Sequence, residues 1–236
     1  ICLGINGIVG AGIFLLPGRI AALAGPASIF LYLLCGMLCL AIALCFAEMG
    51  GMYQQTGGAY LYARDTFGPM IGFMVGWMIW LSAIIGWATM ASGFLLYLRS
   101  FSPALSEGWR GKIIVAALII SLSSLNVLGV KIGARIINFF TISKLIPICI
   151  FVTWGFSHVE VSLLHPIFVF DVKNIGSAAV IALFAYTGFE HLSVPAGEMR
   201  NPKRDIPKAF FLVIIGSTII YILVQTIAIG TFPELA

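Results

Sequence analysis

Polar residues interrupt a long apolar run in the segment FAYTGFEHLSVPAGEMRNPKRDIP, residues 184–207. Thr187 and Gly188 stand inside that run, and Glu190 and His191 follow them directly. Glycine weakens a helix by about 1 kcal/mol relative to alanine, and a carboxylate at the centre of a bilayer costs about 2.5 to 3.5 kcal/mol. The pattern therefore indicates a broken membrane helix whose freed backbone groups face a small polar ligand instead of lipid.

A second interruption lies near the start of the chain, where GINGIVGAGIF contains Gly4, Gly7, Gly10 and Gly12. The spacing of the first two glycines also suits close helix packing, which stays an alternative there. The triplet Gly10-Ala11-Gly12 is different, because it removes side chains from one turn and lets a ligand approach the backbone. Exposed N–H groups at Ile13 and Phe14 would then favour a carboxylate.

Composition places both interruptions in a membrane protein. The chain is 61% hydrophobic and 9% charged, its mean hydropathy is +1.08, and soluble domains average about 25% charged residues. The five cysteines all lie in apolar runs, so we predict small core residues and no disulfide framework. The sequence has no zinc-ligand spacing, no P-loop and no basic patch for nucleic acid.

Apolar stretches long enough to cross a bilayer recur along the whole chain. A hydrocarbon core of about 30 Å needs about 20 helical residues. Seven stretches qualify, at residues 3–24, 28–49, 70–98, 112–129, 135–156, 174–196 and 208–231. Because the connections are short, we predict one all-α integral membrane domain over residues 1–236. The chain begins without Met and inside an apolar run, so we expect it to be a fragment.

The two interrupted spans are the first and the sixth, so they cross the membrane in opposite directions. Paired breaks in oppositely oriented helices are typical of an inverted repeat with its ligand site near the membrane midplane. Spans one to five would form the first repeat, and spans six and seven would start the second. At least three more spans are then expected in the complete protein.

Lys144 is an isolated cation near the middle of the fifth span, about 13 Å from the start of that helix at 1.5 Å per residue. Snorkelling to the interface is difficult from that depth. Pro147 follows one turn later and frees a backbone carbonyl nearby. The alternatives are an interfacial lysine, a structural cap for broken backbone elsewhere in the bundle, and a functional residue.

Positive residues set the expected orientation. Four of them lie between spans six and seven, close to the membrane: Arg200, Lys203, Arg204 and Lys208. Cytoplasmic loops carry the excess of Lys and Arg. We therefore place the start of span one on the cytoplasmic side of a multi-pass protein of the cell membrane.

Three motifs, GIVGAGIFLLPG, AEMGGMYQQTGGAYLYARDTFGP and FAYTGFEHLSVPAGEMRNPKRDIPKA, together resemble the amino acid-polyamine-organocation superfamily of transporters. The resemblance covers essentially the whole chain. It implies a leucine-transporter-type inverted-repeat helix bundle, truncated here to about seven transmembrane helices. Complete members ordinarily have two five-helix repeats and often two further helices.

The resemblance also implies a substrate site. The family binds the substrate carboxylate at the break of span one, which matches Ile8, Val9, Gly10, Ala11 and Gly12. It binds the amine through carbonyls of span six, which match Phe184, Ala185 and Thr187.

Phe184 is similar to a gating aromatic that is Trp in arginine/agmatine exchangers, with ordinary packing as the alternative. A weaker match of span three, whose aromatics otherwise suit packing or interfacial anchoring, puts Trp87 and Met90 beside the pocket. Ala11 lacks the hydroxyl that many relatives have there.

Two charged residues are candidates for coupling. Lys144 matches a position where several sodium-independent members carry a lysine in place of a sodium site, so the resemblance implies transport without sodium. Glu190 is either a pH-responsive group or a permanently ionised structural partner of backbone donors or of Lys144.

We therefore predict secondary active transport of amino acids or related amines by alternating access, driven by proton coupling or by exchange. A channel would need a continuous polar pore, for which the spans offer few positions. A non-transporting membrane sensor of amino acids is the other alternative. An enzyme is not predicted, because no nucleophile, base or metal ligands converge. The expected partners are the substrate, protons as one alternative, and the lipid bilayer, with no cofactor, metal or nucleic acid. The sequence assigns no oligomeric state.

Overall fold

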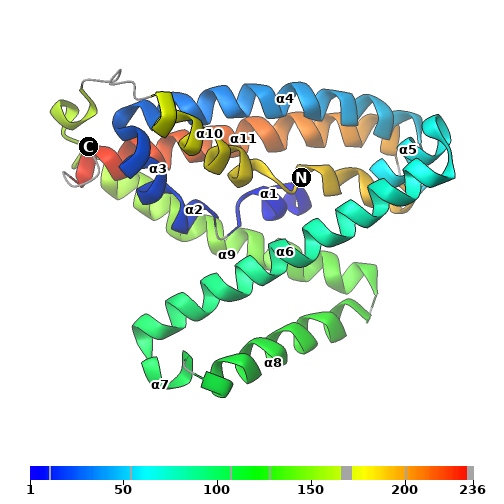
Figure 1. The fold of residues 1–236 in the computed structure, drawn as a ribbon, viewed down its shortest axis with the longest axis horizontal. Helices are drawn as coiled ribbons and strands as arrows, with labels where there is room; N and C mark the ends of the chain where they lie inside the picture. The colour runs from blue at the N-terminus through cyan, green and yellow to red at the C-terminus, as the bar shows by residue number, and fades with distance from the viewer. Residues whose placement is uncertain are drawn as a thin grey trace.

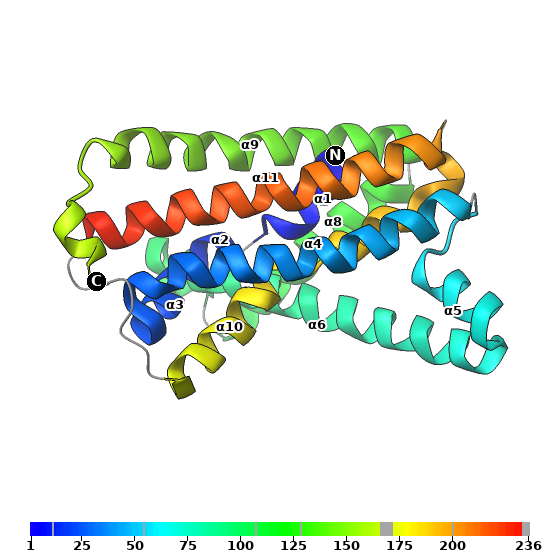
Figure 2. The ribbon, with the colours of Figure 1, turned by 90° about the horizontal axis from the view of Figure 1, so that it is seen from above.

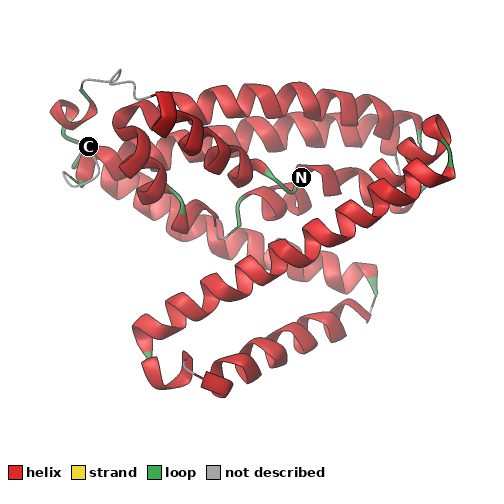
Figure 3. Cartoon of the chain, in the orientation of Figure 1, coloured by secondary structure: helices red, strands yellow, loops and turns green. Residues whose placement is uncertain are grey.

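The computed structural model describes residues 1–10, 12–53, 55–106, 108–127, 129–165, 172–199 and 201–232. Within these ranges the chain forms helices joined by short loops, with no strand, as Figure 3 shows. The helices are α1 (Cys2–Ile8), α2 (Gly12–Leu15), α3 (Pro17–Ala24), η1 (Gly25–Ala27), α4 (Ser28–Met52), α5 (Ala59–Phe67), α6 (Pro69–Phe101), α7 (Pro103–Ser106), α8 (Gly108–Val127), α9 (Val130–Phe156), η2 (Val161–Leu164), α10 (Val172–Tyr186), η3 (Phe189–Glu198) and α11 (Pro202–Thr231).

Six helical stretches of the described residues are long and apolar enough to cross a membrane. The predicted first span is divided instead among α1, α2 and α3, and its apolar part Cys2–Leu15 is too short to count by itself. The predicted sixth span is divided into α10 and η3. Both spans that were expected to be broken are therefore broken, the first after Ile8 and the second at residues 187–188. The prediction of an all-α membrane fold is confirmed.

The core lies between α4 and α11, which run side by side along the length of the molecule (Figure 1). Helices α10 and α3 pack against α4 and against each other. Fully buried aromatic side chains fill this core, with Tyr32 from α4, Tyr186 from α10, and Phe210 and Tyr221 from α11. One of the two breaks directly follows α10, so this well-packed core helps to position it.

The helices α6 and α8 pack on this core much less closely. Figure 1 shows α6 crossing the molecule diagonally and α8 returning beside it, while Figure 2 shows α9 lying along α11. Large apolar side chains on α6, such as Trp77 and Trp80, are half exposed. Apolar surface of this kind suits a helix face that contacts the hydrocarbon of a bilayer.

The loop expected after the second span contains a short helix that was not predicted, α5. Two glycines in positive-φ conformations bound it, Gly58 at 52° and Gly68 at 91°. Such conformations cost glycine little, so they allow the chain to enter and leave a nine-residue helix sharply. Arg64 and Asp65 on α5 form an exposed ion pair at 2.9 Å.

Candidate functional site

The break of span one leaves the end of α1 with backbone groups that the helix itself cannot satisfy. The amide of Val9 donates to Ile5 and the amide of Gly10 donates to Ile8, both at 2.8 Å. The chain then turns, and α2 begins at Gly12. The last carbonyls of any helix lack partners within the helix. Other elements can therefore supply donors to the carbonyls of Asn6 and Val9, and a second donor to the carbonyl of Ile8.

Lys144 on α9 supplies donors to two of these carbonyls and to one side-chain oxygen. Its ammonium donates to the Asn6 carbonyl at 3.1 Å, to the Asn6 side-chain oxygen at 2.6 Å, and to the Val9 carbonyl. An ammonium has three donors, so all of them are used. The structure thus places the Lys144 ammonium at the end of α1. Its role in coupling stays a prediction.

Tyr221 on α11 supplies another donor, and sequence reasoning missed it. Its hydroxyl lies 2.8 Å from the Ile8 carbonyl oxygen and 2.8 Å from the Ala185 carbonyl oxygen. The side chain is 1% exposed. A signal was present in the sequence, because the polar residues Ser217, Tyr221 and Gln225 recur every four residues along the apolar part of this helix.

The break of span six depends on Gly188. Its φ is +112°, which favours glycine, and its amide donates to the Glu190 carboxylate at 2.9 Å. The structure therefore gives the Glu190 carboxylate a backbone donor. The alternative of a structural partner for backbone donors predicts such a contact. His191 is exposed, whereas Glu190 is half-buried. The adjacent acid and imidazole do not form a common site.

The two breaks lie against each other. A Cβ on Gly188 would be 2.7 Å from the Gly7 carbonyl oxygen, and one on Gly7 would be 3.0 Å from the Gly188 carbonyl oxygen. A Cβ on Gly12 would be 3.9 Å from the Cα of Ala185. Backbone therefore meets backbone where most helices would be separated by side chains.

The carbonyls predicted to bind the substrate amine are partly occupied. Phe184 accepts hydrogen bonds from the Thr187 amide at 3.1 Å and from the Thr187 hydroxyl at 2.7 Å. Ala185 accepts from Tyr221. A carbonyl oxygen has two lone pairs, so a ligand at Phe184 must displace or share a bond from Thr187.

The remaining predicted residues lie at different distances from the breaks. Met90 on α6 is close, since a Cβ on Gly10 would be 3.2 Å from its terminal methyl carbon. Trp87 is 67% exposed and Phe184 is 47% exposed, so both side chains are accessible. Ile8 and Val9 are buried. Ala11 lies outside the described residues. The binding roles of all these residues stay predictions.

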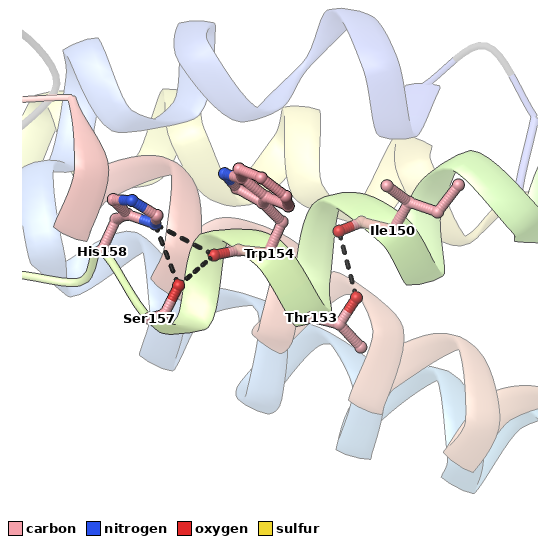
Figure 4. Close-up of a pocket in the computed structure, with 5 residues that line it drawn as sticks. All are labelled: Ile150, Thr153, Trp154, Ser157 and His158. Atoms are coloured by element: carbon pink, nitrogen blue, oxygen red, sulfur yellow. Dashed lines mark hydrogen bonds between the residues drawn. The ribbon is translucent and has the colours of Figure 1, made fainter.

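A surface hollow at the C-terminal end of α9 is separate from this site. It is lined by Ile150, Thr153, Trp154, Ser157 and His158, which all belong to one helix and its end (Figure 4). The polar groups drawn there bond to each other, as where Ser157 donates to the Trp154 carbonyl at 2.8 Å. None of these residues was a candidate. No cluster of three or more metal-ligating side chains occurs in the described part of the chain.

Two interrupted helices thus touch at glycines, and side chains from α9 and α11 donate hydrogen bonds to their free carbonyls. This arrangement is that of a multi-pass membrane protein with unwound helix segments at its centre. The amino acid permease family matches residues 1–235, so the chain belongs to that family. This confirms the predicted superfamily, which consists of transporters and permeases and not of enzymes.

Three relatives from Bacillus subtilis are named for different substrates. The chain is 29% identical to a methylthioribose transporter and 28% identical to a branched-chain amino acid permease, over 98% of this chain and 53% of each relative. It is 34% identical to a serine/threonine exchanger, over 94% of this chain and 51% of the relative. The chain thus spans about half the length of the curated relatives it matches.

Proposed function

We propose that the complete protein carries amino acids or related amines across the membrane by alternating access. One observation carries this proposal: the breaks of the first and sixth spans meet backbone to backbone at Gly7 and Gly188. Unwound backbone at membrane depth is tolerated where it is buried in protein or lines a cavity. Paired breaks of this kind form the substrate and ion sites of inverted-repeat transporters.

The relatives support the substrate class. Two of the three named above are named for amino acids, and one is named for methylthioribose, which is a sugar derivative. An amino acid offers a carboxylate and an ammonium, and the two breaks offer backbone N–H groups and carbonyls. This polar complementarity favours an amino acid, and methylthioribose is the second candidate because of the first relative.

The proposed contacts follow from that complementarity. The backbone of residues 8–12 would bind the carboxylate, and the carbonyls of Phe184, Ala185 and Thr187 would bind the ammonium. Met90 and Trp87 would line one wall, with Phe184 above the substrate. The closeness of Gly10 to Met90 supports this wall.

Transport is proposed to be independent of sodium, with proton coupling or exchange. The support is the ammonium of Lys144, which occupies carbonyls that a sodium ion would otherwise need. Glu190 is the second proposed coupling residue. It lies next to the break of span six, where its carboxylate accepts a hydrogen bond from the Gly188 amide.

The chain is proposed to lie in the cell membrane as one domain, with span one starting in the cytoplasm. Spans one to five would form one repeat, and the next two would start its inverted partner. The basic residues before and at the start of α11 support this orientation.

The test is uptake by the full-length protein in proteoliposomes. The probes are labelled L-leucine, L-serine and methylthioribose, each with sodium or choline outside and with or without a pH gradient. Saturable uptake of an amino acid without sodium is expected, and counterflow separates a carrier from a channel or a sensor. Uptake of methylthioribose alone would replace the amino acid proposal with the second candidate.

A further inference from the structure

Gln225 is a buried polar side chain near the end of α11 that has no part in the proposed substrate contacts. It is 0% exposed. Its side-chain nitrogen donates to the Pro17 carbonyl at 3.2 Å and to the Ser28 hydroxyl oxygen at 2.8 Å. An amide nitrogen of this kind carries two protons, so both are used. The two acceptors therefore show what the side chain holds.

Those acceptors lie at the two ends of residues 17–28, the segment that contains α3 and η1. Pro17 is the first residue of α3, and Ser28 is the first residue of α4. The Ser28 hydroxyl donates in turn to the Gly25 carbonyl at 2.6 Å, in η1. Figures 1 and 2 show α3, the start of α4 and the end of α11 together at one end of the molecule. Gln225 thus closes the connection between the first two spans from a third helix.

Packing alone does not require a glutamine at this position. The side-chain oxygen of Gln225 is buried and has no hydrogen-bond partner among the described residues. An unpaired polar atom of this kind costs free energy that an apolar side chain of similar size would avoid. Pro17 also begins a helix whose own amides can satisfy its carbonyl. The two bonds from Gln225 therefore add constraints on the position of α3.

Helix α3 connects Gln225 to the break of span one. The Leu16 amide donates to the Gly12 carbonyl at 2.9 Å, and the Ile20 amide donates to the Leu16 carbonyl at 2.9 Å. These bonds join α2 to α3 across Pro17, which has no amide proton of its own. Gly12 begins α2 and belongs to the backbone that is proposed to bind the substrate carboxylate. A shift of Pro17 would therefore also shift Gly12.

We propose that Gln225 is a positioning residue that fixes α3 against α4 and α11 and so sets the position of Gly12. The second part rests on the transport function proposed above, because it takes the backbone of residues 8–12 as the carboxylate site. Gln225 acts through the carbonyl of Pro17 and needs no contact with the substrate. The carboxylate then meets backbone groups that are already in place, which lowers the free-energy cost of binding.

A packing role is the competing explanation, since α3 also buries apolar side chains such as Ile20 and Ala24. Gln225→Met separates the two explanations, because methionine is similarly long and unbranched but has no donor. A packing role predicts wild-type behaviour for this variant. Thr226→Val is the matched control, because the Thr226 hydroxyl donates at 2.7 Å to the Ile222 carbonyl of the same helix.

The first measurement needs no substrate. Backbone hydrogen exchange is compared for residues 13–24 in the full-length protein in lipid nanodiscs. Loss of the bonds from Gln225 should make exchange about 10-fold faster in this segment of Gln225→Met. Thr226→Val should match the wild type. Unchanged exchange in Gln225→Met, or equal acceleration in both variants, overturns the proposal.

A second variant tests the reach of the side chain and serves if Gln225→Met fails to fold. Gln225→Asn keeps the amide but is one methylene shorter, so it does not reach both acceptors. Exchange over residues 13–24 should then be faster than in the wild type. Wild-type exchange in Gln225→Asn would contradict the need for both bonds.

The third measurement tests the connection to the substrate site. In proteoliposomes with labelled L-leucine and L-serine, Gln225→Met should raise the KM about 10-fold, the effect expected for one weakened hydrogen-bonding contact, with a smaller change in kcat. Thr226→Val should leave both constants unchanged.

The outcomes separate this proposal from the transport function. An unchanged KM together with faster exchange overturns the connection to Gly12, while the positioning of α3 and the transport function stand. A wild type that transports neither amino acid overturns that connection together with the amino acid proposal. The exchange comparison then decides the positioning of α3 by itself.

Discussion

Gly7 and Gly188 touch through their backbones, so that a Cβ on Gly188 would be 2.7 Å from the carbonyl oxygen of Gly7. This contact joins the first and sixth spans where each is unwound. Neither residue leaves room for a side chain, and Gly188 also has a φ of +112°. The contact thus combines a conformational requirement with a steric one.

Gly188→Ala should lower the thermal unfolding midpoint of the purified protein. A non-glycine residue in such a backbone conformation costs about 1 to 3 kcal/mol, and the clash with Gly7 adds to it. Gly176→Ala is the matched control in α10, because nothing lies within 4 Å of its Cβ position. It should stabilise the protein by about 0.5 to 1 kcal/mol. Equal midpoints for Gly188→Ala and the wild type would show that the contact contributes little.

Gly12→Val should abolish substrate binding while the protein still inserts and folds. The added side chain would enter the space between the start of α2 and Ala185, where a Cβ is 3.3 Å from Leu16 and 3.9 Å from the Ala185 Cα. The measurements are size-exclusion profile and ligand affinity. Gly86→Val, on an open part of α6, should bind normally. Wild-type affinity in folded Gly12→Val would remove this end of span one from the site.

Lys144→Ala should lose transport or bind substrate more weakly. The Asn6 and Val9 carbonyls would lose their donor, and each unsatisfied buried acceptor costs about 1 to 3 kcal/mol. Lys112→Ala removes an exposed lysine at the start of α8 and should transport normally. Uptake is measured with and without sodium. A strict sodium requirement in the wild type would contradict the proposed replacement of a sodium ion by Lys144.

Glu190→Gln should keep the hydrogen bond from the Gly188 amide, because glutamine retains a side-chain carbonyl oxygen. It removes the titratable charge. If Glu190 couples transport to protons, uptake by the variant should lose its dependence on the pH gradient. An unchanged pH profile would assign Glu190 a structural role only.

Phe184→Ala should loosen occlusion of bound substrate and speed its release. The side chain is 47% exposed and directly precedes Ala185, whose carbonyl faces Tyr221. Release of labelled L-leucine from the full-length variant is the measurement. Identical affinity and rate would identify Phe184 as an ordinary packing residue.

Much of the fold could be predicted because its signals are local. A run of apolar residues specifies a membrane helix wherever it occurs, and glycines next to polar residues weaken that helix wherever it packs. The breaks after Ile8 and at residues 187–188 therefore followed from sequence, as did the helical segments around them. The short helix α5 was missed because it depends on two positive-φ glycines in a segment without a clear apolar period.

What only the tertiary structure decided is which side chain meets which unwound carbonyl. Tyr221 reaches Ile8 across 213 residues of sequence, and Lys144 reaches Asn6 and Val9 from another helix. These contacts depend on how each helix is rotated about its axis. Membrane helices are apolar on most sides, so hydropathy specifies that they span but leaves their rotation open. The sequence alone therefore determined where the backbone is free, and the packing of α4, α9 and α11 determined what it binds.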